Sequence, residues 1–133
     1  MPRGKYLLNE QERVLADLLE KGYIPVVSTI GCDAEGNTYN INADTAAAKI
    51  AVSLGAEKLI LLTDIRGLLR DRNDESTLIS QVRLSEVPAL VDEGTISGGM
   101  IPKVTACTDA IEKGVRRVHI LNGTIPHPII LEI

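Results

Sequence analysis

The stretch that decides the fold is Lys58-Leu59-Ile60-Leu61-Leu62-Thr63, a nearly continuous apolar run of strand length. A strand of a parallel sheet is covered on both faces, so its sequence lacks the alternation of apolar and polar residues that marks a half-exposed strand. A second run of this kind is Arg117 to Leu121, RVHIL. The two runs therefore predict buried strands of a mainly parallel sheet.

Helical segments alternate with these strands. Residues 9–21 place aliphatic side chains on one helical face, and Gly22 supplies a C-terminal stop. The alanine-rich run from Asn42 to about Leu54 predicts a second helix, and two more are expected at about Leu84 to Glu93 and at Pro102 to Lys113. This alternation predicts an α/β fold, a three-layer αβα sandwich around the sheet.

Three further segments complete the expected fold. Residues 32–37 (CDAEGN) are turn formers between two short extended stretches and predict a β-hairpin insertion. Tyr23 to Ser28 (YIPVVS) predicts a short strand, with Pro25 at its beginning or at an edge. Pro128 to Ile133 predicts the start of another buried strand, and we expect that the chain is truncated there.

The composition fits one compact domain over residues 1–133. Hydrophobic residues make up 44% of the chain, enough for a core, although Phe and Trp are lacking. Few aromatic rings and a net charge of -4 argue against the base stacking and basic patches of nucleic-acid binding. No apolar stretch approaches the roughly 20 residues that span a bilayer. We therefore expect a soluble protein with small-molecule partners and no membrane contact.

The thiols and imidazoles do not predict a reactive or metal-binding cluster. Cys32 and Cys107 lie far apart in a chain with ample core, so we expect reduced thiols in a cytoplasmic protein rather than a disulfide framework. His119 and His127 lack metal-ligand spacing, and the acidic run at residues 71–75 does not match a calcium loop. We expect no metal site made by the protein itself.

Polar residues gather at the entrance of the second predicted helix, in Asn40-Ile41-Asn42-Ala43-Asp44. If Ile41 points into the core, the period of two sends Asn40 and Asn42 to the opposite side, toward the space that Asp44 borders. Asn42 also fits an N-cap, and the helix dipole favours a carboxylate in the first turn. Capping explains Asn42 and Asp44 but not Asn40, so a capped helix and a binding site both remain open.

Two other segments have the composition of a ligand site. Thr63 to Leu68 (TDIRGL) follows a buried strand, and ligands of open α/β sheets bind outside the carboxyl ends of strands. Ser97 to Lys103 (SGGMIPK) leads glycines into a helix, where a lysine opposes the dipole unless an anion is bound. The first segment also fits a polar turn, and the second also fits a surface lysine on a glycine-capped helix.

Five segments, taken in order, resemble the carboxy-terminal half of the N-acetylglutamate kinases, a branch of the amino acid kinase family. They are GYIPVVSTIG, NINADTAAA, KLILLTDIRGL, EGTISGGMIPKV and GVRRVHILNGTIPHPIILEI. The resemblance implies part of the carbamate kinase-like fold of that family. It also implies an enzyme that uses ATP, with Mg²⁺ bound through the nucleotide, to phosphorylate the side-chain carboxylate of N-acetyl-L-glutamate in arginine biosynthesis.

The resemblance assigns roles to residues of this chain. Asp44 resembles the carboxylate that orders the catalytic lysines, and Lys103 resembles a lysine that stabilises the transferring phosphoryl group. Asn40 resembles the amide that contacts the acylated amino acid, and Asn42 is placed beside it in the substrate site. The nucleotide-binding residues that the resemblance implies are Thr63, Asp64, Ile65, Arg66, Gly67, Leu68, Thr95, Ile96, Ser97, Gly99 and Lys103.

The sequence also departs from that family. The amino-terminal half, with a Gly-Gly phosphate loop, a second catalytic lysine and most of the acyl-amino-acid pocket, is absent. We therefore expect weak ATP binding, no turnover by this chain alone, and a homo-oligomer. The alternative is a non-catalytic nucleotide-binding or regulatory module derived from an amino acid kinase. A kinase of glutamate or carbamate fits Asn40 and SGGMIPK less well.

Overall fold

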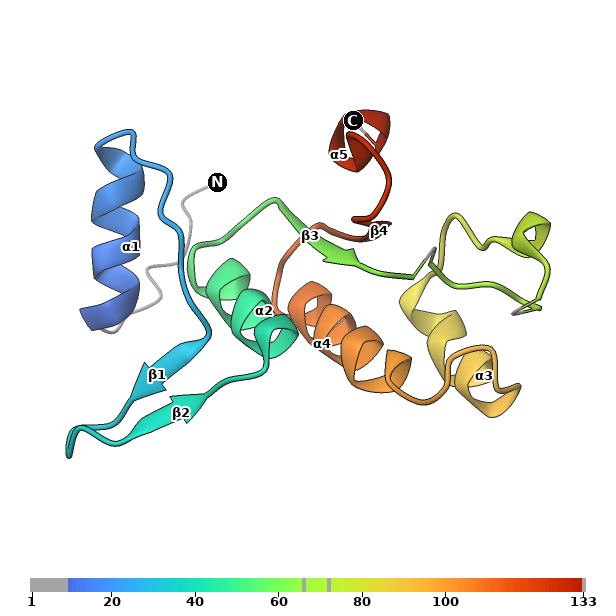
Figure 1. The fold of residues 1–133 in the computed structure, drawn as a ribbon, viewed down its shortest axis with the longest axis horizontal. Coiled ribbons are helices and arrows are strands. Elements are labelled where there is room, and N and C mark those ends of the chain that lie inside the picture. The colour runs from blue at the N-terminus through green and yellow to red at the C-terminus, as the bar shows by residue number, and fades with distance from the viewer. Residues whose placement is uncertain (1–9, 66, 72, 133) are drawn as a thin grey trace.

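The computed structural model describes residues 10–65, 67–71 and 73–132 (Figure 1). The elements follow one another in the order that the sequence predicted for an α/β fold. They are α1 (Glu10–Glu20), β1 (Ile30–Cys32), β2 (Thr38–Asn40), α2 (Ala43–Ser53), β3 (Lys58–Thr63), α3 (Val87–Asp92), α4 (Met100–Glu112), β4 (Arg117–Asn122) and α5 (Pro128–Glu132), with short 3-10 helices at Glu75–Thr77 and Leu84–Glu86.

The centre of the fold is a parallel pair of strands, β3 and β4. Their register runs from Lys58 opposite Arg117 to Thr63 opposite Asn122. This confirms the parallel pairing expected of two continuous apolar runs. Both carboxyl ends therefore lie at the same edge of the sheet, the edge where ligands of such sheets bind.

One face of this pair is covered by α2 and α4, which lie side by side beneath it in Figure 1. Small residues allow this close packing, because the core there contains Ala48, Ala51 and Ala110. Leu59 and Leu61 of β3 complete it from the sheet side. A second core of Leu90, Ile96 and Val104 joins α3 to α4.

Helix α2 begins and ends as its sequence predicts. Asn42 is the N-cap, with extended φ and ψ of -60° and 125°, and its side chain accepts a hydrogen bond from the Thr45 N–H. Alanine is the best helix former, so the run that follows favours a helix, and packing of Ala48 and Ala51 in the core stabilises its 11 residues. Gly55 follows the helix at φ 61°, a conformation that ends helices and suits glycine.

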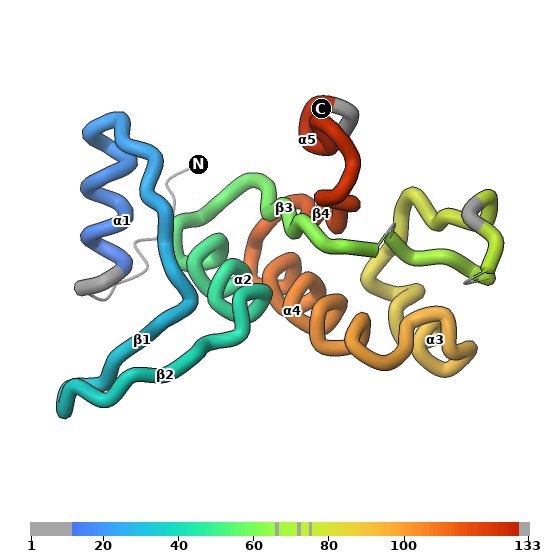
Figure 2. The backbone as a smooth tube through the Cα atoms, in the orientation of Figure 1, coloured from blue at the N-terminus to red at the C-terminus, as the bar shows by residue number. Residues whose placement is uncertain are grey.

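The predicted β-hairpin is confirmed. β1 and β2 pair antiparallel, with Ile30 opposite Asn40 and Cys32 opposite Thr38. Figure 2 shows this hairpin and α1 at one end of the molecule, α3 at the other, and the parallel strand pair between them. Cys32 and Cys107 are both free thiols, as expected.

Two expected strands are wrong. Tyr23–Ser28 forms no strand, since no described segment pairs with it, and Ile24 and Val26 are 91% and 96% exposed. The apolar run near the C-terminus forms the helix α5 instead of a strand, while Ile133 lies outside the described residues. Pro128 explains this difference, because proline at the first position of a helix has the required φ and loses no hydrogen bond. Within the described residues, no helix is both long and apolar enough to cross a membrane.

Candidate functional site

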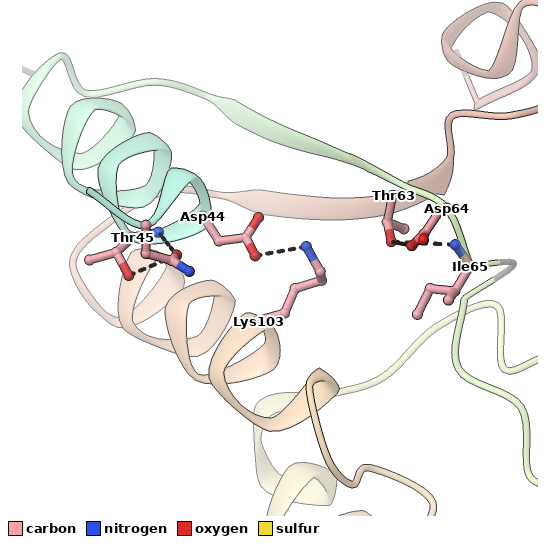
Figure 3. Close-up of polar contacts among 7 residues, drawn as sticks. Asp44, Thr45, Thr63, Asp64, Ile65 and Lys103 are labelled. Carbon is pink, nitrogen blue, oxygen red and sulfur yellow. Dashed lines mark hydrogen bonds and ion pairs between the residues drawn. The ribbon is translucent and has the colours of Figure 1, made fainter. Parts of the chain in front are cut away.

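The candidate site is built around an ion pair between two helix entrances. Asp44 lies in the first turn of α2 and Lys103 near the start of α4. The Lys103 Nζ is 2.7 Å from the Asp44 Oδ2, and the two side chains are 15% and 26% exposed. Figure 3 shows the ammonium between the Asp44 carboxylate and the turn that follows β3. The pair is therefore partly shielded but open toward the carboxyl edge of the sheet.

Asn42 holds the start of α2 in place. Its Oδ1 accepts hydrogen bonds from the Thr45 N–H at 3.0 Å and from the Thr45 hydroxyl at 3.2 Å. The capping role that the sequence allowed for Asn42 is thus observed, and its place in the substrate site stays a prediction. Asn40 is exposed at the end of β2, and the hydrogen bond and ion pair between Asp44 and Lys103 do not include it.

Cys107 packs beneath the ion pair, one turn along α4 from Lys103, and belongs to the buried core. Burial, followed by the nearby Asp44 carboxylate, raises the pKa of this thiol to about 11, while Lys103 opposes the shift. Sequence reasoning treated Cys107 only as a structural thiol. The signal for its position was the four-residue spacing from Lys103, which puts both on one helix face.

The entrance of α4 presents unpaired backbone donors. The N–H groups of Ser97, Gly98 and Gly99 donate no hydrogen bond to another described residue. Gly98 has φ 56° and Gly99 has φ -64°, a left-handed residue followed by a right-handed one. Successive N–H groups in such a conformation form a concave anion site, and the dipole of α4 favours negative charge there. The Ser97 hydroxyl is also buried, with no hydrogen-bond partner in the part of the chain that the structure describes.

The two glycines at this entrance differ in what their positions demand. A Cβ at either position would meet no protein atom within 4 Å. Gly98 has a positive φ, so its backbone alone favours glycine. Gly99 has an ordinary helical φ, and neither backbone strain nor packing within the protein explains it. Open space beside Gly99 leaves room for a ligand to approach the backbone.

The turn after β3 borders the same region (Figure 3). The Thr63 hydroxyl donates to the Asp64 carboxylate at 3.4 Å and accepts from the Ile65 N–H at 3.4 Å, both long contacts. Arg66 lies outside the described residues. Gly67 has φ 123°, and Leu68 packs against the second core. The last residue of the predicted nucleotide segment is therefore part of the protein interior.

The remaining predicted nucleotide residues precede α4. Thr95 is half-buried, and the Ile96 side chain is only 1% exposed inside the second core. Any contact of Ile96 with a ligand would therefore use its backbone. Across the described residues, no group of three or more His, Cys, Asp and Glu side chains is placed to hold a metal ion.

A cavity of about 370 Å³ lies between α4, β4 and the segment that follows β3, and Gly67 and Leu68 of the predicted nucleotide segment line it together with Cys107. Its lining is mostly apolar and includes Val104, Ile111 and Ile120. Neither Asp44 nor Lys103 lines it. The charged site is thus an open edge of the sheet and not this cavity.

A parallel sheet with a lysine–carboxylate pair and unpaired N–H groups at its carboxyl edge defines a class of protein: an α/β protein with a candidate anion-binding site. The chain belongs to the amino acid kinase family, whose model matches residues 4–122. Membership in this family agrees with the α/β fold and the parallel strands described above.

Known proteins similar to this chain include one curated relative and two solved structures. An acetylglutamate kinase from Heliobacterium modesticaldum is 54% identical over 90% of this chain and 41% of its own length. A solved structure of N-acetylglutamate synthase from Neisseria gonorrhoeae, complexed with coenzyme A and N-acetyl-glutamate, matches this chain with a TM-score of 0.75 and 29% identity. The match covers 90% of this chain and 27% of that chain.

Carbamate kinase from Giardia lamblia, bound to AMP-PNP, shares the fold at a TM-score of 0.65 and 22% identity, over 86% of this chain and 44% of that chain. The chain therefore spans less than half the length of the curated relative and of both solved proteins.

Proposed function

We propose that this chain is the ATP-binding part of an acetylglutamate kinase. In this proposal the complete enzyme transfers the γ-phosphoryl group of ATP to the side-chain carboxylate of N-acetyl-L-glutamate. The relative at 54% identity carries that enzyme's name. The observation that carries the proposal is the Lys103–Asp44 ion pair beside the unpaired N–H groups of the α4 entrance.

These groups suit the phosphates of a nucleotide. The N–H groups of residues 97–99 and the positive end of the α4 dipole would hold phosphate oxygens. The Lys103 ammonium would neutralise charge on the transferring phosphoryl group, where such stabilisation accelerates phosphoryl transfer. Asp44 would hold the ammonium in position through the 2.7 Å contact rather than remove a proton.

The proposed reaction needs no general base. The acceptor carboxylate is already ionised near neutral pH, so its oxygen can attack the γ-phosphorus directly. The new bond joins that oxygen to phosphorus, the bond from phosphorus to the β,γ-bridging oxygen breaks, and ADP leaves with that electron pair. The products are an acyl phosphate and ADP. Mg²⁺, carried by the nucleotide, would supply further neutralisation of the phosphate charge.

Substrate binding and turnover depend on more than this chain in the proposed scheme. Asn40 would contact the acylated amino acid from the end of β2, where its side chain is exposed. The second lysine and most of the acceptor pocket would come from sequence beyond this chain, in the amino-terminal half of a complete enzyme. We therefore expect MgATP binding without phosphorylation by this chain alone, in the cytoplasm, as part of a homo-oligomer.

Calorimetric titration with MgATP tests the proposal. Lys103→Ala should weaken binding by about tenfold to a hundredfold, the usual weight of a hydrogen bond to a charged group. Lys113→Ala is the matched control, since it removes the same charge from the far end of α4, where the lysine is 62% exposed and pairs with Asp109 at 3.5 Å. That control should bind MgATP as the parent does.

A second variant tests the backbone cradle. Gly99→Ala should keep the fold, because φ there is -64° and a Cβ meets no protein atom, yet it should weaken MgATP binding by crowding the phosphates. Folded chain that binds no MgATP at millimolar concentration, or that binds equally well without Lys103, would contradict the proposal.

The alternative is a module that binds a nucleotide without catalysis. The fold also occurs in a protein named as a synthase, at 29% identity. Joining this chain to the missing part of the Heliobacterium kinase distinguishes the two functions. Phosphorylation of N-acetyl-L-glutamate that depends on Lys103 supports the kinase, while binding without turnover in the joined protein supports the module.

A further inference from the structure

The hairpin that leads into α2 contains a close contact between Gly31 and Ile41. Gly31 of β1 lies opposite Tyr39, and the Ile41 N–H donates to the Thr29 carbonyl at 2.8 Å. The antiparallel pairing thus extends past β2 to Ile41, so Gly31 and Ile41 are diagonal neighbours on one face of the hairpin. A Cβ on Gly31 would lie 2.6 Å from the Ile41 Cδ1 and 3.5 Å from its Cγ1. The isoleucine therefore occupies the space that a side chain at position 31 would fill.

This contact explains why position 31 is glycine. Gly31 does not have a positive φ, so its backbone conformation is open to other residues. Glycine inside a strand weakens the strand and often marks a place where another group approaches closely. The group that approaches here is Ile41, which is 42% exposed and belongs to neither of the two cores described above. The Ile41 side chain therefore packs on the hairpin and not in the interior of the domain.

Ile41 lies where the hairpin joins the helix. Only Ile41 and Asn42 separate β2 from α2, and Figure 1 shows the hairpin running directly into that helix. Successive side chains of an extended chain point to opposite faces, so the face that Ile41 takes sets the face of its neighbour Asn40. Asn42, on the other side, is fixed as the cap of α2. The position of Ile41 on Gly31 thus links the direction of Asn40 to the start of α2.

We propose that Gly31 and Ile41 are positioning residues for the acceptor substrate. The isoleucine that lies on the glycine holds the hairpin at one orientation to α2, and this orientation directs Asn40 toward the acylated amino acid. Neither residue touches the substrate itself. The inference rests on the proposed function for the ligand of Asn40. A larger residue at position 31 would displace Ile41, and Asn40 would turn with it.

The orientation of the hairpin is measured first, in this chain without any ligand. Residual dipolar couplings of backbone N–H groups report how β1 and β2 lie relative to α2. Ile41→Ala empties the contact, and Gly31→Val forces the isoleucine away. Valine is used because rotation of the isoleucine Cδ1 could accommodate the single Cβ of alanine. Both variants should change the couplings of the hairpin, and combining Gly31→Val with Ile41→Ala refills the space and should restore the parent couplings.

The affinity for N-acetyl-L-glutamate is measured next, by calorimetry, in the protein that joins this chain to the missing part of the Heliobacterium kinase. Each single variant should weaken acceptor binding by about fivefold or more, and the combined variant should return it to within about twofold of the parent, because the two positions share one contact. Binding of MgATP should stay within about twofold throughout, since a purely structural defect would weaken both ligands. Thr38→Val, at an exposed position of β2, is the control and should change neither affinity.

The outcomes separate this inference from the proposed function. Hairpin couplings that stay unchanged in both single variants overturn the inference, as do losses of acceptor affinity that multiply in the combined variant or that accompany equal losses for MgATP. Failure of the proposed function looks different, because the joined protein then binds no N-acetyl-L-glutamate even without substitutions. The couplings still decide in that case whether the contact between Gly31 and Ile41 sets the orientation of the hairpin.

Discussion

Asn42 connects the local chemistry of one helix end to the position of the Asp44 carboxylate. Its side chain caps α2 through the Thr45 N–H, which fixes the first turn from which Asp44 reaches Lys103. Another capping side chain, such as serine, can replace asparagine at an N-cap. Serine cannot reproduce a contact that the asparagine amide makes with a ligand. Substitution at Asn42 therefore distinguishes the two roles that the sequence left open.

Asn42→Ala should lower the free energy of unfolding by about 1 kcal/mol, because the N-cap hydrogen bond is lost. It should also weaken MgATP binding, by less than Lys103→Ala does, because Asp44 is held less firmly. Asn42→Ser should restore both quantities. Urea unfolding and calorimetry measure them, and an Asn42→Ser variant that is stable but impaired in the complete enzyme would show that the amide itself contacts substrate.

Each half of the ion pair could be predicted from sequence, but not the pairing. Asp44 follows a cap residue and Lys103 follows two glycines, and these are local signals of helix entrances. Their contact joins residues 59 positions apart and depends on how α2 packs on α4. The sequence separation of Asp44 and Lys103 does not show how the two helices pack. Only the resemblance to a family therefore predicted that the two residues act together. The structure then supplied the unpaired N–H groups beside them.

Among the secondary-structure elements, the β1–β2 hairpin is organised by one carboxylate. Asp33 accepts hydrogen bonds from the Asn37 side chain at 2.9 Å, the Tyr39 hydroxyl at 2.8 Å and the Asn37 N–H at 2.8 Å. The Asn37 side chain, followed by the Tyr39 hydroxyl, lowers the pKa of Asp33 to about 2. The same contact raises the pKa of Tyr39 above its ordinary value.

The hairpin should therefore lose order in acid. The folded pKa of Asp33 lies below the unfolded value of about 3.9, so its stabilisation is present above that value and is lost as the pH falls toward about 2. NMR titration of the Asn37 amide should follow this transition. Tyr39→Phe should move the pKa of Asp33 upward. If Asp33 of the parent chain titrates near pH 4, the hydrogen bonds from Asn37 and Tyr39 do not stabilise its carboxylate, and the prediction is wrong.

The secondary-structure predictions were correct where neighbouring residues in the sequence determine the element. The strand predicted at residues 23–28 was wrong, because a strand also needs a second strand to pair with. The caps of α2, the turn of the hairpin and the two apolar strands were predicted by local residues. Tyr23–Ser28 has the composition of a strand but pairs with no described segment. In α5, Pro128 at the first position outweighed an apolar run that fits either a strand or a helix.

On the scale of the whole molecule, one residue joins the two cores. Ile120 of β4 packs against the cluster of Leu59, Leu61 and Ala110 and also against the cluster of Ile96 and Val104. Helix α4 likewise contributes to both clusters. The candidate site depends on this connection, because the α4 entrance is supported by the second core and Asp44 by the first. We therefore expect the two cores to unfold together.

Ile120→Ala should lower the free energy of unfolding by about 1–2 kcal/mol, less than for a fully buried isoleucine because Ile120 is only partly buried. Since the side chain belongs to both clusters, hydrogen exchange at the amides of Ala110 and Ile96 should accelerate by the same factor. Ile129→Ala, at a side chain that is 39% exposed in α5, is the matched control and should change both amides little. Acceleration at only one of the two amides would mean that the cores open independently, and the α4 entrance could then lose its structure while the Asp44 side of the site stays folded.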